Sequence, residues 1–159
     1  MKILIISDTH GNHDNLEIVL EQEKPLDLLI HLGDAQRKED YIEAMAECPM
    51  EIVAGNNDFY SNLPMEMELK IGKYKAFLTH GHYYYVNAGI ERIKKEGMGR
   101  NADIVMFGHT HKHVVEKDGA MIILNPGSIS YPRQEGRRAS YIIMELDENG
   151  EAHFYLKYL

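Results

Sequence analysis

Short apolar runs, separated by polar and turn-rich segments, extend along the whole chain. In the first half the runs consist of β-branched residues and leucine, and such runs predict strands buried on both faces. They lie at residues 3–6, 26–32 and 51–54. Between them, apolar residues recur at helical spacing around 16–20 and 41–46. Strand–helix alternations of this length favour right-handed βαβ units and a mainly parallel sheet.

The second half of the chain predicts hairpins. Three pairs of short strands are separated by turn sequences such as Lys117-Asp118-Gly119. The pairs are 67–70 with 73–78, 114–116 with 121–124, and 140–146 with 152–158. A helix over 86–95, followed by Gly97 and Gly99, and a buried strand over 103–107 complete the pattern. We therefore expect an α/β fold in which two sheets pack face to face and helices cover the outside.

Composition indicates one globular domain, residues 1–159. Hydrophobic residues make up 44% of the sequence and charged residues 26%. The formal net charge of -8 disfavours nucleic acid as a partner, because such binding depends on Lys and Arg against phosphates. Cys48 is the only cysteine, no secretion signal is recognisable, and no apolar stretch approaches the length of a membrane helix. These features predict a cytoplasmic protein that does not bind membranes.

Candidate metal ligands gather just after predicted strands. Three oxygen donors and four imidazoles stand in five segments: Asp8-Thr9-His10, Gly33-Asp34, Gly55-Asn56, Thr79-His80 and Gly108-His109-Thr110-His111. Functional groups in open α/β sheets collect at the carboxyl ends of strands, so we expect all seven at one rim. In extended chain, residues two apart point to the same side, which would align Asp8 with His10 and His109 with His111. The neighbouring glycines are expected to let the backbone turn sharply.

Each segment alone has an ordinary structural explanation. An Asp after a strand is more often the N-cap of the next helix, and Gly-Asp is more often a turn. Coincident caps and turns do not explain five such segments at five strand ends. Seven donors exceed the needs of one ion and suit two ions that share a bridging carboxylate, an arrangement that holds a phosphoryl group and activates water. Mixed imidazole and oxygen donors favour Mn, Ni, Fe, Zn or Co over Ca or Mg.

The ordered motifs resemble those of the calcineurin-like metallophosphoesterase superfamily, namely D-x-H, G-D, G-N-H-[D/E], H and G-H-x-H. The chain carries them as Asp8-Thr9-His10, Gly33-Asp34, Gly55-Asn56-Asn57-Asp58, His80 and Gly108-His109-Thr110-His111. Its short length and Asn125-Pro126-Gly127-Ser128 make it most similar to the small bacterial and archaeal phosphodiesterases of the YfcE type. The resemblance covers the chain nearly end to end. It implies a four-layer α/β/β/α sandwich of two mixed sheets flanked by helices.

The resemblance also implies a centre of two divalent transition-metal ions, with Mn expected first. Asp8, His10, Asp34 and His111 would hold one ion. Asn56, His80 and His109 would hold the other, and Asp34 would bridge the two. A hydroxide that bridges the ions would then hydrolyse a small phosphodiester substrate without a covalent enzyme intermediate.

Asn57 departs from the family pattern. The superfamily commonly has His at this position, and several small members have Cys, so the residue that protonates the leaving group is unknown. The amide of Asn57 can still hydrogen-bond a phosphoryl oxygen, and Asp58 is left to brace the loop. His82 and Arg133 are further candidates for substrate binding, Arg133 as a phosphate clamp. A solvated loop side chain is the alternative for both.

Two other functions fit the same resemblance. The scaffold subunit of the retromer complex has this fold without catalysis; Asn57 points in that direction, whereas the intact set of seven ligands does not. A nuclease of the superfamily would usually carry extra domains and a basic track, and the sequence shows neither. The sequence leaves the physiological substrate, the native metal and assembly into a homo-oligomer open.

Overall fold

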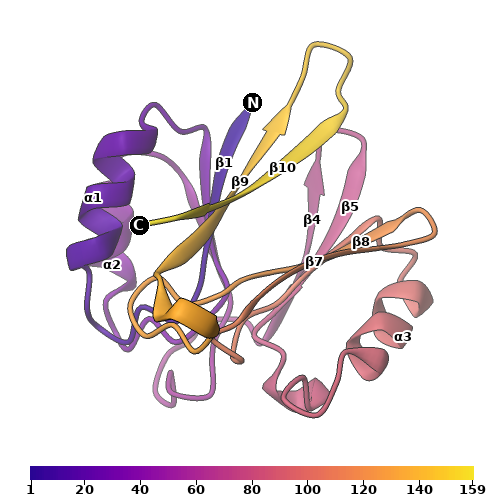
Figure 1. Ribbon diagram of the computed structural model, residues 1–159, viewed down its shortest axis with the longest axis horizontal. Coiled ribbons are helices and arrows are strands. Elements are labelled where there is room, and N and C mark those ends of the chain that lie inside the picture. Colours follow the sequence, from indigo (N-terminus) through magenta and orange to yellow (C-terminus); the bar gives the residue numbers. More distant parts are fainter.

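The computed structural model describes residues 1–159 as two five-stranded sheets packed face to face (Figure 1). The first sheet has the order β10-β9-β1-β2-β3 and the second β4-β5-β6-β8-β7. The first contains β1 (Lys2–Ile6), β2 (Leu28–His31), β3 (Met50–Ile52), β9 (Ser140–Leu146) and β10 (Ala152–Tyr158). The second contains β4 (Glu66–Ile71), β5 (Tyr74–Thr79), β6 (Ile104–Met106), β7 (His113–Asp118) and β8 (Met121–Pro126).

Both sheets are mixed. In the first, β1, β2 and β3 run parallel, while β9 and β10 add an antiparallel hairpin. In the second, β5, β6 and β8 run parallel, and β4 and β7 are antiparallel edge strands. The parallel arrangement expected from the first half of the chain is therefore correct for its three strands, and the hairpins of the second half supply the antiparallel ones.

Helices form the two outer layers. In Figure 1, α1 (Asp14–Glu23) and α2 (Glu39–Ala46) lie outside the first sheet, and α3 (Glu91–Gly99) lies outside the second. Two short 3-10 helices, η1 (His82–Tyr84) and η2 (Glu135–Arg137), lie in loops. The expected four-layer α/β/β/α sandwich is confirmed. None of the helices has the length and apolar character needed to cross a membrane.

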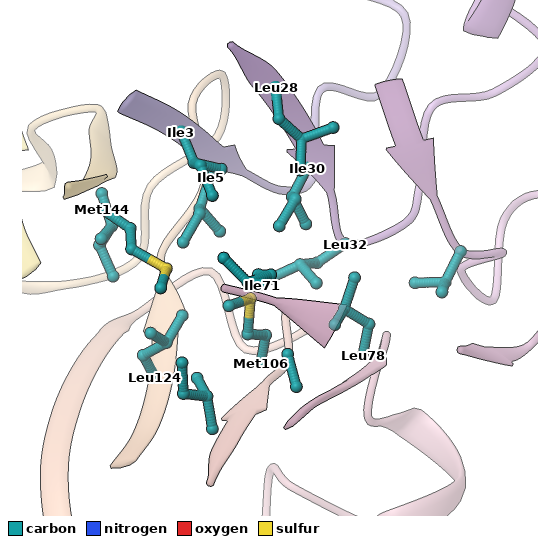
Figure 2. Close-up of a cluster of buried hydrophobic side chains, with 14 residues drawn as sticks. Ile3, Ile5, Leu28, Ile30, Leu32, Ile71, Leu78, Met106, Leu124 and Met144 are labelled. Carbon is teal, nitrogen blue, oxygen red and sulfur yellow. The ribbon is translucent and has the colours of Figure 1, made fainter. Parts of the chain in front are cut away.

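Strand β1 shows why its run is apolar without alternation. Ile3 and Ile5 point into the space between the sheets, in one cluster with residues of the second sheet such as Met106 and Leu124 (Figure 2). Leu4 and Ile6 point the other way and pack under α1 and α2. Because both faces of the strand are buried, its backbone is fixed, and so is the loop that follows it.

The helix expected over 86–95 begins later, at Glu91, and continues through Gly97 to Gly99. Gly89 has a φ of +148°, a conformation incompatible with a helix, so the earlier residues form η1 and a loop instead. Gly97 does not end the helix. It lies where α3 approaches β6 closely. A Cβ atom there would lie 2.4 Å from Val105 Cγ2.

Candidate metal centre

Five loops, three from the first sheet and two from the second, place the seven predicted ligands at one rim. Asp8 and His10, Asp34, and Asn56 follow β1, β2 and β3. His80 follows β5, and His109 and His111 follow β6. The Asp8 carboxylate joins the two sheets, because its Oδ2 accepts a hydrogen bond from the His109 backbone N–H at 3.1 Å.

Asp8, His10 and His111 form one group with ligand atoms close together. The two imidazole Nε2 atoms lie 3.2 Å apart. Asp8 Oδ1 lies 3.2 Å from His111 Nε2 and 3.8 Å from His10 Nε2. It is buried and has no hydrogen-bond partner.

Asp34 and His80 form a second group, which Asp8 also joins. Asp34 Oδ2 lies 3.5 Å from Nε2 of His80 and 3.5 Å from Nε2 of His10, so it stands between the two groups. Asn56 belongs with the second group, because its Oδ1 is 3.1 Å from His80 Nε2.

His109 is the predicted ligand that stands apart from both groups. Its ring packs edge-on against His80, with the centroids 5.2 Å apart. Its Nε2 lies 2.8 Å from the side-chain amide of Asn87. Nothing in the sequence pattern pointed to Asn87.

The backbone at the rim is left-handed rather than extended. Five of the seven predicted ligands have positive φ: Asp8 (57°), His10 (47°), Asp34 (62°), His109 (68°) and His111 (58°). The expectation of an extended backbone is therefore wrong at both pairs, although Asp8 and His10 still bring their ligand atoms into one group. Left-handed non-glycine residues are uncommon, although Asp and His adopt this conformation more readily than most, and they concentrate at functional sites.

Backbone carbonyl oxygens orient the imidazole rings of His111 and His80. His111 Nδ1 lies 2.6 Å from the Tyr131 carbonyl oxygen, and His80 Nδ1 lies 2.6 Å from that of Leu32. Because a carbonyl only accepts, each Nδ1 carries the proton and donates it, which leaves Nε2 with a free lone pair. This is the orientation that metal-binding histidines need.

The carboxylates at the rim are held in the charged state. Burial opposes ionisation of Asp8, but the rings of His111 and His80 outweigh it and lower the pKa of Asp8 below its usual value. Asp34 behaves in the same way: burial is outweighed by His80 and by hydrogen bonds from Asn57, and its pKa falls. Burial lowers the pKa of His10 and of His109, whereas at His80 the carboxylates of Asp34 and Asp8 outweigh burial and raise the pKa. Metal binding needs charged carboxylates and neutral imidazoles, so an ion would have to displace the proton that the carboxylates favour at His80.

The donor set fits divalent ions. Ligand atoms about 3 to 3.5 Å apart suit metal–ligand bonds of about 2.0–2.2 Å. An ion beside Asp8 Oδ1 would give this buried oxygen the partner that the protein does not, and a buried carboxylate oxygen left unpaired is otherwise costly.

Asn57 and Asp58 form hydrogen bonds with the loops that carry the candidate ligands. Asn57 donates two hydrogen bonds to the Asp34 carboxylate, one from its backbone N–H and one from its side chain. The Asp58 carboxylate accepts from the backbone N–H groups of Asp34 (2.7 Å), Gln36 (2.7 Å) and Gly55 (2.8 Å). Asp58 therefore braces the loop, as expected.

The other two predicted substrate contacts lie on opposite sides of the rim. His82 is half-buried beside His80 and His109, and burial together with those two rings lowers its pKa to about 4. Arg133 lines an open hollow of about 800 Å³ next to His10 and His111. The hollow is also lined by Arg137, a residue that sequence reasoning missed because it follows no motif.

Comparison with known proteins identifies close relatives. The model of the calcineurin-like phosphoesterase superfamily domain matches residues 1–149. "Probable metallophosphoesterase YsnB" of Bacillus subtilis (strain 168) is 33% identical over 150 residues, which cover 94% of this chain and 86% of the relative. "Phosphodiesterase YfcE" of Escherichia coli (strain K12) is 31% identical over 172 residues, covering 92% and 89%.

Solved structures agree on the fold. A conserved protein of Streptococcus pneumoniae TIGR4, described as a predicted phosphoesterase, superposes with a TM-score of 0.80 at 26% identity, over 98% of this chain and 97% of that one. A Vps29 variant from Entamoeba histolytica superposes equally well, with a TM-score of 0.80 at 22% identity over 100% and 99% of the chains. At that identity the second match shows the fold alone.

Proposed function

The chain belongs to the calcineurin-like phosphoesterase superfamily, and on that premise we propose that it is a phosphodiesterase that depends on two divalent transition-metal ions, with Mn as the metal to test first. The single observation that carries the proposal is Asp8 Oδ1, a buried oxygen without a hydrogen-bond partner that lies within 3.9 Å of three imidazole nitrogens. The relative named phosphodiesterase supports the choice of reaction.

The proposed ligand sets follow the two groups at the rim. Asp8, His10, Asp34 and His111 would hold the first ion, and Asp34, Asn56, His80 and His109 would hold the second. The bridging role of Asp34 is supported by the equal distance of 3.5 Å from its Oδ2 to His10 and to His80. Asp8 Oδ1 is nearer to His111 than to His80, at 3.2 Å against 3.9 Å, which supports its place in the first set.

Bound ions would lower the pKa of a water molecule and offset the charge of the phosphoryl oxygens. The protein's own side chains orient the ligands and the substrate. Asn57 holds the Asp34 carboxylate by both oxygens. Arg133 would contact a phosphoryl oxygen from the hollow, and His82 would contact the substrate from the opposite side. We keep Asn57 as a further candidate contact through its amide.

The expected substrates are small phosphodiesters. A phosphomonoester dianion needs more positive charge than a diester monoanion, and neither Asp8 nor Asp34 pairs with a Lys or Arg. The chain would carry out this reaction as a single domain over residues 1–159 in the cytoplasm. Assembly into a homo-oligomer is compatible with it.

The test is reconstitution with Mn, Ni, Fe, Zn and Co, followed by elemental analysis and turnover. We expect two ions per chain, and faster hydrolysis of bis(4-nitrophenyl) phosphate than of 4-nitrophenyl phosphate. A protein that binds none of these metals would refute the proposal. A clear preference for the monoester with every metal would refute the substrate class while leaving the metal centre in place.

A non-catalytic scaffold is the alternative function. The departure from the family pattern at Asn57 favours it, and the fold shared with Vps29 is compatible with it. The same measurement separates the two, because a scaffold would need neither metal nor turnover. A chain that hydrolyses no phosphoester with any of these metals would support the scaffold.

A further inference from the structure

Two arginines without a side-chain partner line the hollow beside His10 and His111. The sequence has six arginines, and the other four are each engaged. Arg37 and Arg92 lie over the rings of Tyr60 and Tyr85, Arg100 pairs with Glu66 and Glu96, and Arg138 donates to the Leu159 carbonyl over the Tyr158 ring. Arg133 and Arg137 have no ion pair, side-chain hydrogen bond or aromatic partner, and both lie in this hollow.

The segment that carries the two arginines is tied to a proposed metal ligand. Arg133 donates its backbone N–H to the His111 carbonyl at 2.9 Å, and the Tyr131 carbonyl accepts from the His111 ring. The turn then closes on itself, since the Arg137 N–H donates to the Gln134 carbonyl at 3.0 Å. The backbone positions of both arginines are therefore fixed relative to the candidate centre.

The hollow has the opposite charge to the rest of the molecule. The chain has 25 acidic residues against 17 Lys and Arg, yet no carboxylate lines this hollow. Gln36 and the ring of Tyr131, which packs edge-on against His10 with centroids 5.6 Å apart, complete its walls. Two guanidinium groups offer several planar N–H donors, the geometry that suits phosphate oxygens.

We propose that this hollow binds a second phosphate of the substrate. The phosphoryl group that reacts would lie beside the metal ligands. Arg133 and Arg137 line the hollow next to it, and together they provide more positive charge than a single diester phosphate requires. The preferred substrate class is then a phosphodiester with an additional phosphomonoester on one arm. This inference rests on the proposed function, which it makes more specific.

Binding tests the subsite without turnover. Titration calorimetry of the Mn-reconstituted protein would compare adenosine 5′-monophosphate with adenosine 3′,5′-bisphosphate. We expect at least tenfold tighter binding of the bisphosphate, and we expect Arg137→Gln to remove most of this difference. Arg138→Gln is the matched control, because it removes the same charge one residue further along from a side chain that points to Leu159 and Tyr158. Equal affinity for the two nucleotides, or an equal effect of both variants, would overturn the proposal.

Turnover separates the subsite from the proposed function. Dinucleoside monophosphates with and without a terminal phosphate, at the 5′ or the 3′ end, would be compared by kcat/KM. We expect at least a tenfold preference for one phosphorylated form, a smaller ratio in Arg137→Gln, and a decline with added salt. Equal kcat/KM values with equal nucleotide affinities would overturn the subsite and leave the phosphodiesterase standing. If no diester, including bis(4-nitrophenyl) phosphate, is hydrolysed while the bisphosphate still binds through Arg137, the subsite stands and the phosphodiesterase falls.

Discussion

Asn57 holds both oxygens of the Asp34 carboxylate. Its backbone N–H donates to Oδ1 at 2.8 Å, and its side-chain Nδ2 donates to Oδ2 at 2.7 Å. The residue that departs from the family pattern thus supports the carboxylate proposed to bridge the ions. Its amide is engaged in the protein even before any contact with substrate.

We expect Asn57→Ala to weaken metal binding. The variant keeps the backbone hydrogen bond to Asp34 and loses the side-chain one, and loss of such an outer partner typically costs about 10- to 100-fold in affinity. Titration of the chelated protein with Mn would measure this change. Asn149→Ala, in the turn before β10, is the control and should bind as the wild type does. Unchanged affinity in Asn57→Ala would show that Asp34 does not depend on the amide.

We expect Asn57→His to change how the rate depends on the leaving group. If the site lacks an acid, slow alkyl diesters should gain most from an added imidazole, and nitrophenyl diesters should gain least. General-acid catalysis is typically worth about 10²- to 10⁴-fold. We expect less, because the variant loses the hydrogen bond from the Asn57 side-chain amide to the Asp34 carboxylate. A leaving-group series on both proteins at equal metal content measures the slope. An unchanged slope would place the acid elsewhere, with His82 the next candidate.

We expect Asp34→Asn to lower occupancy of both metal positions. The charge of this carboxylate serves both proposed ligand sets, whereas His111→Ala and His80→Ala should each remove one ion. Elemental analysis after reconstitution gives the ratio of metal to chain directly. His153→Ala, an exposed histidine beside Asp147, is the control for histidine loss. Full metal content and activity in Asp34→Asn would show that the bridging assignment is wrong.

Glu23 links stability to pH far from the candidate centre. Its side chain is 6% exposed and accepts from Lys157 at 2.8 Å and from Tyr141 at 2.8 Å, while Lys2 lies 2.9 Å away. Burial would raise the pKa of Glu23, but Lys157, Lys2 and Tyr141 outweigh it and lower the pKa from 4.5 to about 2. The carboxylate therefore stabilises the fold fully above pH 4.5, and this stabilisation is lost as the pH falls towards 2.

We expect Glu23→Gln to remove this part of the acid sensitivity. A shift of this size corresponds to about 3 kcal/mol of unfolding free energy. The difference in unfolding free energy between wild type and variant should be largest near neutral pH and shrink below pH 4.5. Urea titrations across this range measure it. Glu21→Gln, on the exposed face of the same helix, should show no such trend. A constant difference would mean that Glu23 is not ionised in the folded protein.

The strands and the rim could be predicted from sequence, because apolar runs and strand ends are local signals. The backbone at the rim could not, since the φ angles of Asp8 and His109 depend on contacts between loops. Glycine shows the same limit. Gly55 and Gly108 do not have positive φ; a Cβ there would lie 2.1 Å from Asp34 Oδ1 and 2.0 Å from Ser7 Oγ, so they permit close approach rather than a turn.

Residues that come to the rim from distant segments could not be predicted from the sequence either. Asn87 contacts His109, and Arg137 lines the hollow, but neither belongs to a motif or a periodic pattern. Only the packing of the two sheets brings these positions to the rim. The sequence therefore predicted the candidate ligands more completely than the residues that contact them.

The candidate ligands come from both sheets, which share an apolar core. Ions held between the Asp8 and His80 loops would therefore act as cross-links between the two halves of the sandwich. Binding of this kind favours the folded chain by mass action, by about 2.7 kcal/mol at a free metal concentration 100 times the Kd. Metal scarcity would then also enlarge the unfolded population exposed to proteases.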